Sequence, residues 1–184
     1  TIMPSCKILH LDLDAFFCAV EEQIDSSLRG LPFAVGGRPD QRGVVASCSY
    51  PARRFGVRSA MPMSQALRLC PHLLIRPSNF KAYRAASEQV MQRLNNLTPY
   101  VEQISIDEAF LDVTLLPDSA DSIAYRLQKQ INDELGLPCS LGVAANKLVA
   151  KVANNIGKDR AGKDSPPNAV TIIPPGEEAA FLAP

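Results

Sequence analysis

The chain has 184 residues, which is enough for one domain or for a domain that carries a small insertion. A hydrophobic fraction of 46% and a charged fraction of 21% exclude wholesale disorder, and no apolar run approaches the roughly 20 residues of a transmembrane helix. Lysines and arginines equal aspartates and glutamates at 19 each, and this net charge of zero, taken alone, argues against a nucleic-acid partner.

The first predicted elements are a strand and a helix. Residues 7–11 form a short apolar run that ends at Asp12 and predicts a buried strand. Asp14 is a suitable N-cap for a helix over residues 15–24. Two carboxylates are therefore expected at the junction of strand and helix.

The next predicted elements are short and rich in arginine and turn residues. One of them is a short helix with Pro51 at its start and Gly56 just past its end. Proline at the start and glycine after the end are typical of helices. We predict a hairpin of two strands and then two helices, at 32–35, 44–47, 50–55 and 63–69. Together these elements predict a small inserted subdomain over residues 16–78.

The rest of the chain alternates helices and strands. Asp107 and Glu108 separate two predicted strands and so fall at a tight hairpin turn. The predicted helices cover 79–97, 119–135 and 146–156, the strands cover 101–106, 109–114, 139–144 and 169–173, and a last helical turn covers 177–182.

Without the insertion, the element order is strand, helix, strand, strand, helix, strand. This order predicts an α+β fold, a ferredoxin-like (βαββαβ) domain. Right-handed crossovers place the first strand antiparallel beside the third. The end of the first strand, with Asp12, then meets the turn that carries Asp107 and Glu108. We expect these three carboxylates at one edge of the sheet.

Such a cluster of carboxylates predicts a divalent metal site. Clustered acids repel unless they share a proton or a cation, and Mg²⁺ prefers oxygen ligands. Other ligands are scarce, because the five cysteines form no Cys-x-x-Cys pair and His10 and His72 are the only histidines. Two such ions can clamp the attacking and leaving oxygens of a phosphoryl transfer. The alternative stays open that Asp107 and Glu108 are polar turn residues and that Asp12 and Asp14 are caps.

Several basic side chains are placed to meet phosphate. Tyr50 and Arg53 share a face at the start of a short helix, whose N-terminus itself attracts anions. Lys147, Lys151 and Lys158 are spaced by four and seven residues, so they project within a narrow arc when the helix that begins at Asn146 is extended to Lys158. A solvated lysine stripe is the alternative for that face.

The zero net charge is a sum of opposed blocks. Residues 1–28 carry one basic and five acidic residues, whereas residues 29–76 carry eight arginines and one aspartate. Residues 81–134 carry five basic and nine acidic residues, and residues 135–163 carry five basic residues and one aspartate. Positive charge is therefore concentrated in the insertion and in the lysine-bearing helix.

Four segments carry a family resemblance. They are HLDLDAFF at 10–17, SYPARRFGV at 49–57, SIDEAFLD at 105–112 and LGVAANK at 141–147. In this order they resemble the successive motifs of Y-family translesion DNA polymerases, nearest the DNA polymerase IV (DinB) branch. The resemblance covers residues 7–158, with a weaker match at 169–182.

The resemblance implies roles for the acidic residues. Asp12 and Asp107 would bridge two Mg²⁺ ions, for which Mn²⁺ can substitute, and Glu108 would complete one of the metal sites. The backbone carbonyl of Leu13 would touch the second ion. These three acids would be the catalytic residues.

The resemblance also implies nucleotide contacts. Tyr50, Arg53 and Lys158 would bind the triphosphate of a dNTP, and Phe16 would line the nucleotide pocket. Phe17 would be the steric gate that rejects a ribose 2′-OH. For both phenylalanines, packing in the core is the alternative.

In the family's terms, residues 1–15 and 79–173 would be the palm, residues 16–78 the fingers and residues 174–184 the start of a thumb. The family continues into a thumb and a little-finger domain beyond Pro184. We therefore expect this chain to be a fragment of a longer polymerase that binds DNA weakly by itself. After Lys158 the chain departs from the family's short Pro-Gly turn.

The implied activity is template-directed addition of dNTP to a primer 3′-OH with release of pyrophosphate, by a low-fidelity polymerase in DNA damage tolerance and repair. Primer-template DNA and dNTP are the expected partners, with a sliding clamp engaged through regions beyond this chain. We expect a cytoplasmic monomer without membrane contact. Two alternatives stay open. One is a non-catalytic, polymerase-like accessory protein in DNA repair, and the other is a nucleotidyl cyclase, although SIDEA at 105–109 replaces that class's Gly-Gly-Asp-Glu-Phe-type hairpin.

Overall fold

A computed structural model describes residues 5–183, and the chain divides into two units. The first unit takes the residues up to Asp14, Ser87–Gly162 and the residues from Pro167. The second takes Ala15–Ala86 and Lys163–Pro166, so it extends beyond the predicted end of the insertion at residue 78. Residues 1–4 of the predicted palm and Pro184 of the predicted thumb lie outside the described residues.

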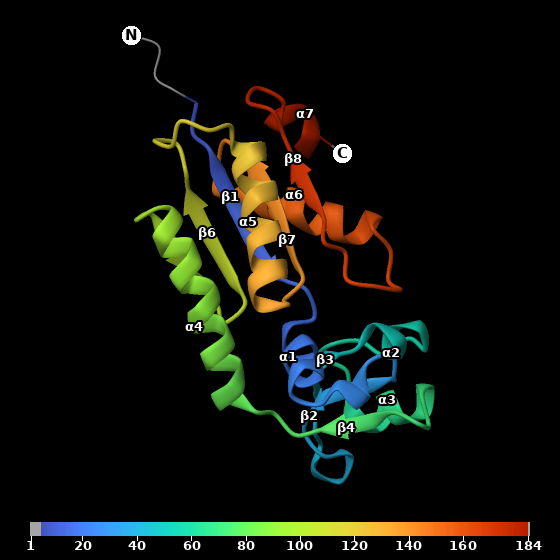
Figure 1. Ribbon diagram of the computed structural model, residues 1–184. Coiled ribbons are helices and arrows are strands. Elements are labelled where there is room, and N and C mark those ends of the chain that lie inside the picture. The colour runs from blue at the N-terminus through green and yellow to red at the C-terminus, as the bar shows by residue number, and fades with distance from the viewer. Residues whose placement is uncertain (1–4, 184) are drawn as a thin grey trace. The chain divides into compact units, whose positions relative to one another are not determined.

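The first unit is built on a five-stranded sheet in the order β5-β6-β1-β7-β8 (Figure 1). The central strand β1 is antiparallel to both β6 and β7, as the βαββαβ order predicts. At one edge β8 pairs parallel with β7. The strands are β1 (Ile8–Leu13), β5 (Val101–Gln103), β6 (Glu108–Asp112), β7 (Cys139–Ala144) and β8 (Val170–Ile172).

Helices cover both faces of this sheet. Figure 1 shows α5 on one face and α6 on the other. The unit's helices are α5 (Ala120–Leu135), α6 (Lys147–Arg160), α7 (Glu178–Leu182) and the part of α4 (Phe80–Leu97) from Ser87 onward. Residues of α6 and of the sheet form one buried apolar cluster. It comprises Ile8, Phe110, Ala144, Val149, Ala150, Ala153 and Ile173. No helix within residues 5–183 is long and apolar enough to cross a membrane.

The close packing of α6 on β7 depends on Gly142. A Cβ atom at this position would lie 1.9 Å from the carbonyl oxygen of Ala150 and 2.7 Å from the backbone nitrogen of Asn154. Because these are backbone atoms, Gly142→Ala would force the helix away from the sheet. We expect the free energy of unfolding in urea to fall by about 1–3 kcal/mol or more.

A matched control for this prediction is Asn155→Ala, an exposed position on the same helix. Its unfolding free energy should stay within about 0.5 kcal/mol of wild type. Equal stabilities for Gly142→Ala and the control would contradict the packing described for α6.

The second unit contains a three-stranded sheet in the order β3-β2-β4. The antiparallel pair β2 (Phe33–Gly36) and β3 (Val45–Cys48) is the predicted hairpin. The third strand, β4 (Leu74–Arg76), is parallel to β2 and was absent from the predicted elements. The helices are α1 (Phe16–Ile24), α2 (Tyr50–Arg54) and α3 (Met63–Leu69), with 3-10 helices η1 (Ser26–Leu28) and η2 (Pro39–Gln41).

The prediction that Asp14 caps α1 is wrong. The N-cap residue is Ala15, in the left-handed conformation with φ 45°, and no side chain caps the helix. Asp14 is instead completely buried, where the Ser140 hydroxyl donates to its carboxylate at 3.0 Å and the Asn168 N–H at 3.1 Å. A buried carboxylate needs such donors, and partners this distant in sequence leave no local signal.

Two other predicted boundaries shift. The turn between β5 and β6 spans residues 104–107, so Glu108 is the first residue of a strand rather than a turn residue. Helix α6 continues to Arg160 instead of ending at residue 156. The longer helix carries Lys158 within its last turn, which fixes the direction of that side chain relative to the sheet.

Candidate functional site

The three predicted acidic residues meet at one end of the sheet in the first unit. In the register of β1 and β6, Asp12 lies opposite Glu108. The backbone N–H of Leu13 donates to the carbonyl oxygen of Asp107 at 3.0 Å, which holds the hairpin turn against the end of β1. The convergence expected from the strand order is therefore present.

Two lysines of α6 form ion pairs with two of these acids, Asp12 and Glu108. The Lys158 ammonium lies 2.7 Å from Asp12 Oδ1 and 3.4 Å from Asp14 Oδ1. The Lys151 ammonium forms an ion pair with Glu108. These two members of the predicted basic face therefore meet the acids of the sheet rather than only solvent.

The environment of Asp12 favours a neighbouring cation. Burial raises the pKa of its carboxyl group, and repulsion from Asp107 and Asp14 adds to the rise, while the Lys158 ammonium opposes it. Burial also acts to lower the pKa of Lys158, but the Asp12 and Asp14 carboxylates outweigh it and the pKa of Lys158 is raised. A positive charge beside Asp12 therefore offsets the cost of burying its carboxylate.

A buried polar pair lies behind Glu108. His10 Nε2 is 2.6 Å from Glu108 Oε1, and His10 Nδ1 is 2.9 Å from Asn154 Nδ2. Burial lowers the pKa of His10. For Glu108, burial acts to raise the pKa, but hydrogen bonds from Lys151 and His10 outweigh it and lower the pKa. Sequence reasoning missed this pair, although His10 stands two residues before Asp12 on a strand and so shares its face.

The donor atoms at this end of the sheet fit a hard cation. Within residues 5–183 no three His, Cys, Asp or Glu side chains are already arranged to hold a metal ion. The acids offer carboxylate oxygens, the ligand type that Mg²⁺ prefers, and each of two carboxylates already contacts a positive charge. Ligand type and charge therefore both suit a divalent ion.

The residues predicted to bind triphosphate divide between the units. Lys158 belongs to the first unit, whereas Tyr50 and Arg53 belong to the second. On α2 the Arg53 guanidinium lies 4.6 Å from the centre of the Tyr50 ring, and Arg53 Nε donates to the Cys48 carbonyl oxygen at 3.2 Å. The Ser49 side chain caps this helix by accepting from the Ala52 N–H. Tyr50 and Arg53 thus share a face, as their spacing predicts.

The two phenylalanines that open α1 have different surroundings. Phe16 is 2% exposed, so its side chain is part of the core of the second unit. Phe17 is half-buried and stacks on Tyr83, with ring centroids 4.3 Å apart and planes at 15°. The Phe80 ring packs against Phe17 in a T-shaped arrangement, with ring centroids 5.9 Å apart. Of the two rings, that of Phe17 is the one a ligand can reach.

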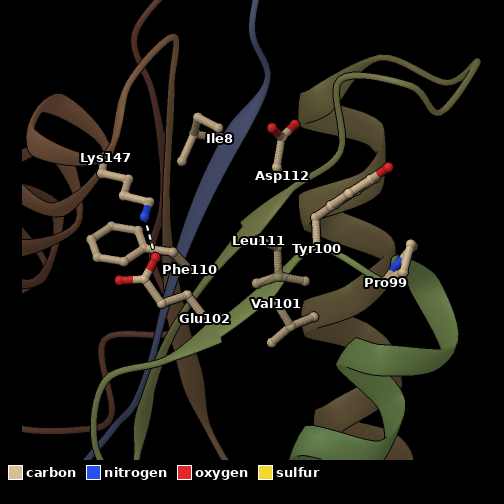
Figure 2. Close-up of a pocket in the computed structure, with 9 residues that line it drawn as sticks. All are labelled: Ile8, Pro99, Tyr100, Val101, Glu102, Phe110, Leu111, Asp112 and Lys147. Atoms are coloured by element: carbon tan, nitrogen blue, oxygen red, sulfur yellow. Dashed lines mark hydrogen bonds and ion pairs between the residues drawn. The ribbon is translucent and has the colours of Figure 1, made fainter.

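A pocket of about 400 Å³ lies elsewhere on the first unit (Figure 2). On its rim Lys147 forms an ion pair with Glu102, and its ammonium lies 5.7 Å from the centre of the Phe110 ring. Of the predicted basic face only Lys147 lines this pocket, and none of the predicted catalytic residues does. The lining residues are Ile8, Pro99, Tyr100, Val101, Glu102, Phe110, Leu111, Asp112 and Lys147. The acids at the end of β1 are therefore separate from this pocket.

Solved structures with the same fold belong to polymerases. DinB from Sulfolobus solfataricus matches with a TM-score of 0.86 and 31% identity, over 96% of this chain and 50% of that one. The insertion ternary complex of Dbh DNA polymerase matches with a TM-score of 0.86 and 31% identity, over 96% of this chain and 51% of that one. At this identity the likeness extends beyond the fold to the sequence.

Curated relatives are DNA polymerases IV. That of Serratia proteamaculans strain 568 is 44% identical over 179 residues, which are 96% of this chain and 48% of that protein. That of Ralstonia nicotianae is 43% identical over 180 residues, again 96% of this chain and 48% of that protein. The chain thus spans about half the length of these relatives. The signature of the impB/mucB/samB family matches residues 11–155, and we conclude that the chain belongs to this family of Y-family polymerases.

Proposed function

We propose that this chain is the catalytic core of a low-fidelity translesion DNA polymerase, which adds dNTPs to a primer 3′-OH on a template and releases pyrophosphate. The observation that carries the proposal is the convergence of Asp12, Asp107 and Glu108 at the end of β1, with lysine ammonium groups on two of them. The names of the relatives support the same reaction class.

Asp12, Asp107 and Glu108 would hold two Mg²⁺ ions, or Mn²⁺ in their place, with the Leu13 carbonyl as a further ligand. Bound there, the ions would stabilise negative charge on the attacking and leaving oxygens of the phosphoryl transfer. A backbone hydrogen bond joins the end of β1 to the hairpin turn that carries the acids. The carboxylates would therefore position the ions without a rearrangement of the backbone.

The nucleotide contacts follow from the resemblance. Tyr50, Arg53 and Lys158 would bind the triphosphate, and Lys158 would do so through an ammonium group that Asp12 and Asp14 keep charged. Phe17 would exclude a ribose 2′-OH, while the buried Phe16 would shape the nucleotide pocket from behind. Engagement of a sliding clamp, a monomeric state and a cytoplasmic location stay predictions.

Incorporation assays with the full-length protein test this function. We expect extension of a primer annealed to a template, with the dNTP chosen by the template base, only when Mg²⁺ or Mn²⁺ is present. Binding of primer-template in a gel shift without metal-dependent extension would instead support the accessory protein. A cyclic product from a single NTP without a primer would support the cyclase, and either result would refute the polymerase.

A further inference from the structure

The side-chain amide of Asn154 points its nitrogen at three acceptors, which share its two hydrogens, while its Oδ1 is buried and has no hydrogen-bond partner among the described residues. Asn154 is completely buried on α6, and its Nδ2 lies 3.3 Å from the carbonyl oxygen of His10 and 3.1 Å from that of Ser140. Carbonyl oxygens only accept hydrogen bonds, so the donating nitrogen must face them. A flipped amide would place its own oxygen against two acceptors.

This orientation determines the tautomer of His10. The same Nδ2 lies 2.9 Å from His10 Nδ1, and because an amide nitrogen can only donate, Nδ1 must accept. A neutral imidazole has one donor and one acceptor, so the hydrogen is on Nε2. Nε2 points to Glu108 Oε1 at 2.6 Å. Hydrogen bonds therefore run in one direction, from Asn154 through His10 to Glu108.

Both donors to Glu108 meet the same oxygen. His10 Nε2 and the Lys151 ammonium each contact Oε1, and neither contact uses Oε2. The two donors differ in kind. Lys151 is a half-exposed cation for which an arriving metal ion would compete, whereas the His10 ring is completely buried and held by Asn154 on its other nitrogen. His10 can therefore keep its hold on Glu108 when a cation binds.

We propose that His10, held as the Nε2–H tautomer by Asn154, is a positioning residue that fixes Oε1 of Glu108 and presents Oε2 to the metal ion. The inference rests on the proposed function, in which Glu108 is a metal ligand. Hydrogen-bond partners behind a ligating group typically contribute about 10–100-fold to metal affinity. His10 would contribute on this scale without touching the ion.

Nitrogen NMR of the ¹⁵N-labelled, metal-free protein tests the tautomer directly. We expect the His10 signals to show a protonated Nε2 and an unprotonated Nδ1, with His10→Gln used to assign them by their disappearance. The opposite tautomer, or an even mixture of the two, would overturn the inference. This measurement needs neither activity nor bound metal.

Calorimetric titration of the full-length protein with Mn²⁺ tests the consequence. His10→Gln places an amide N–H near the position of Nε2 and should keep most of the affinity. His10→Asn is equally polar but too short to reach Glu108, and should bind Mn²⁺ about 10–100-fold more weakly. His72→Asn, at the exposed second histidine, is the control and should match wild type.

The outcomes separate this inference from the proposed function. If His10→Gln and His10→Asn bind Mn²⁺ equally well while wild type also binds it, the positioning role is refuted and the metal site stands. If wild type binds neither Mn²⁺ nor Mg²⁺, the proposed function is refuted together with the inference. Urea unfolding of each variant shows whether the protein is folded under the conditions in which its Mn²⁺ affinity is measured.

Discussion

Replacing Asp107 by alanine in the full-length protein is expected to lower the rate of primer extension by about 10²–10³-fold, the scale of losing one well-placed electrostatic group from a transition state. On the proposed function, this side chain would help to hold the metal ions. Single-turnover extension with saturating dNTP and Mg²⁺ measures the effect.

The same substitution should leave the fold intact. The Asp107 carboxylate accepts from the Ser105 hydroxyl at 2.6 Å within the same turn, and it raises the pKa of Asp12 by repulsion. Removing it therefore relieves a like-charge interaction, and we expect an unfolding free energy equal to or above that of wild type. Stability retained while activity is lost is the signature of a site residue.

Asp118→Ala is the matched control, because Asp118 forms a half-exposed ion pair with Arg126 in the same unit. Its extension rate should equal that of wild type, since such surface pairs contribute little. If Asp107→Ala extends the primer as well as Asp118→Ala does, the catalytic assignment of the acids fails.

Phe17→Ala is expected to admit ribonucleotides. The Phe17 ring is held flat against Tyr83, whose hydroxyl donates to Glu21 Oε1 at 2.6 Å, so truncation removes the accessible ring and leaves its support in place. We expect the preference for dNTP over rNTP to fall by about 10²-fold, the scale on which a pocket rejects one added hydroxyl. The ratio of kcat/KM values for matched dNTP and rNTP pairs measures it.

Phe80→Ala provides the comparison, since Phe80 contacts both Phe17 and Tyr83 edge-on but is 52% exposed. Its sugar selectivity should remain that of wild type. Unchanged rNTP rejection in Phe17→Ala would remove Phe17 from the gate role. Equal relaxation in both variants would assign selectivity to the packing of the aromatic cluster.

The sheet of the first unit was predictable because its order follows from element order and handedness. Once strands were expected around Asp12 and Asp107, right-handed crossovers allowed few arrangements. The strand β4 was not predictable in the same way, since it has only three residues and pairs with a distant strand. A run that short has no periodicity of its own.

The side-chain partners at the candidate site were the less predictable part. Helical spacing placed Lys151 and Lys158 on one face, but the acids that they meet depend on the register of α6 against β1 and β6. Likewise, Asp14 has the local features of a cap, and only Ser140 and Asn168 explain its burial. Contacts between elements, rather than within them, decided these cases.

The pairing of α6 lysines with acids of the sheet has a thermodynamic consequence for ligand binding. On the proposed function, a divalent cation taken up by Asp12 and Glu108 would release the ammonium groups of Lys158 and Lys151. The freed groups would then attract phosphate, so cation and triphosphate would each increase the other's affinity by the same factor. The 19 basic and 19 acidic residues give a net charge of zero only without bound cations. With cations bound, the net charge would be positive, and the protein would then attract polyanions.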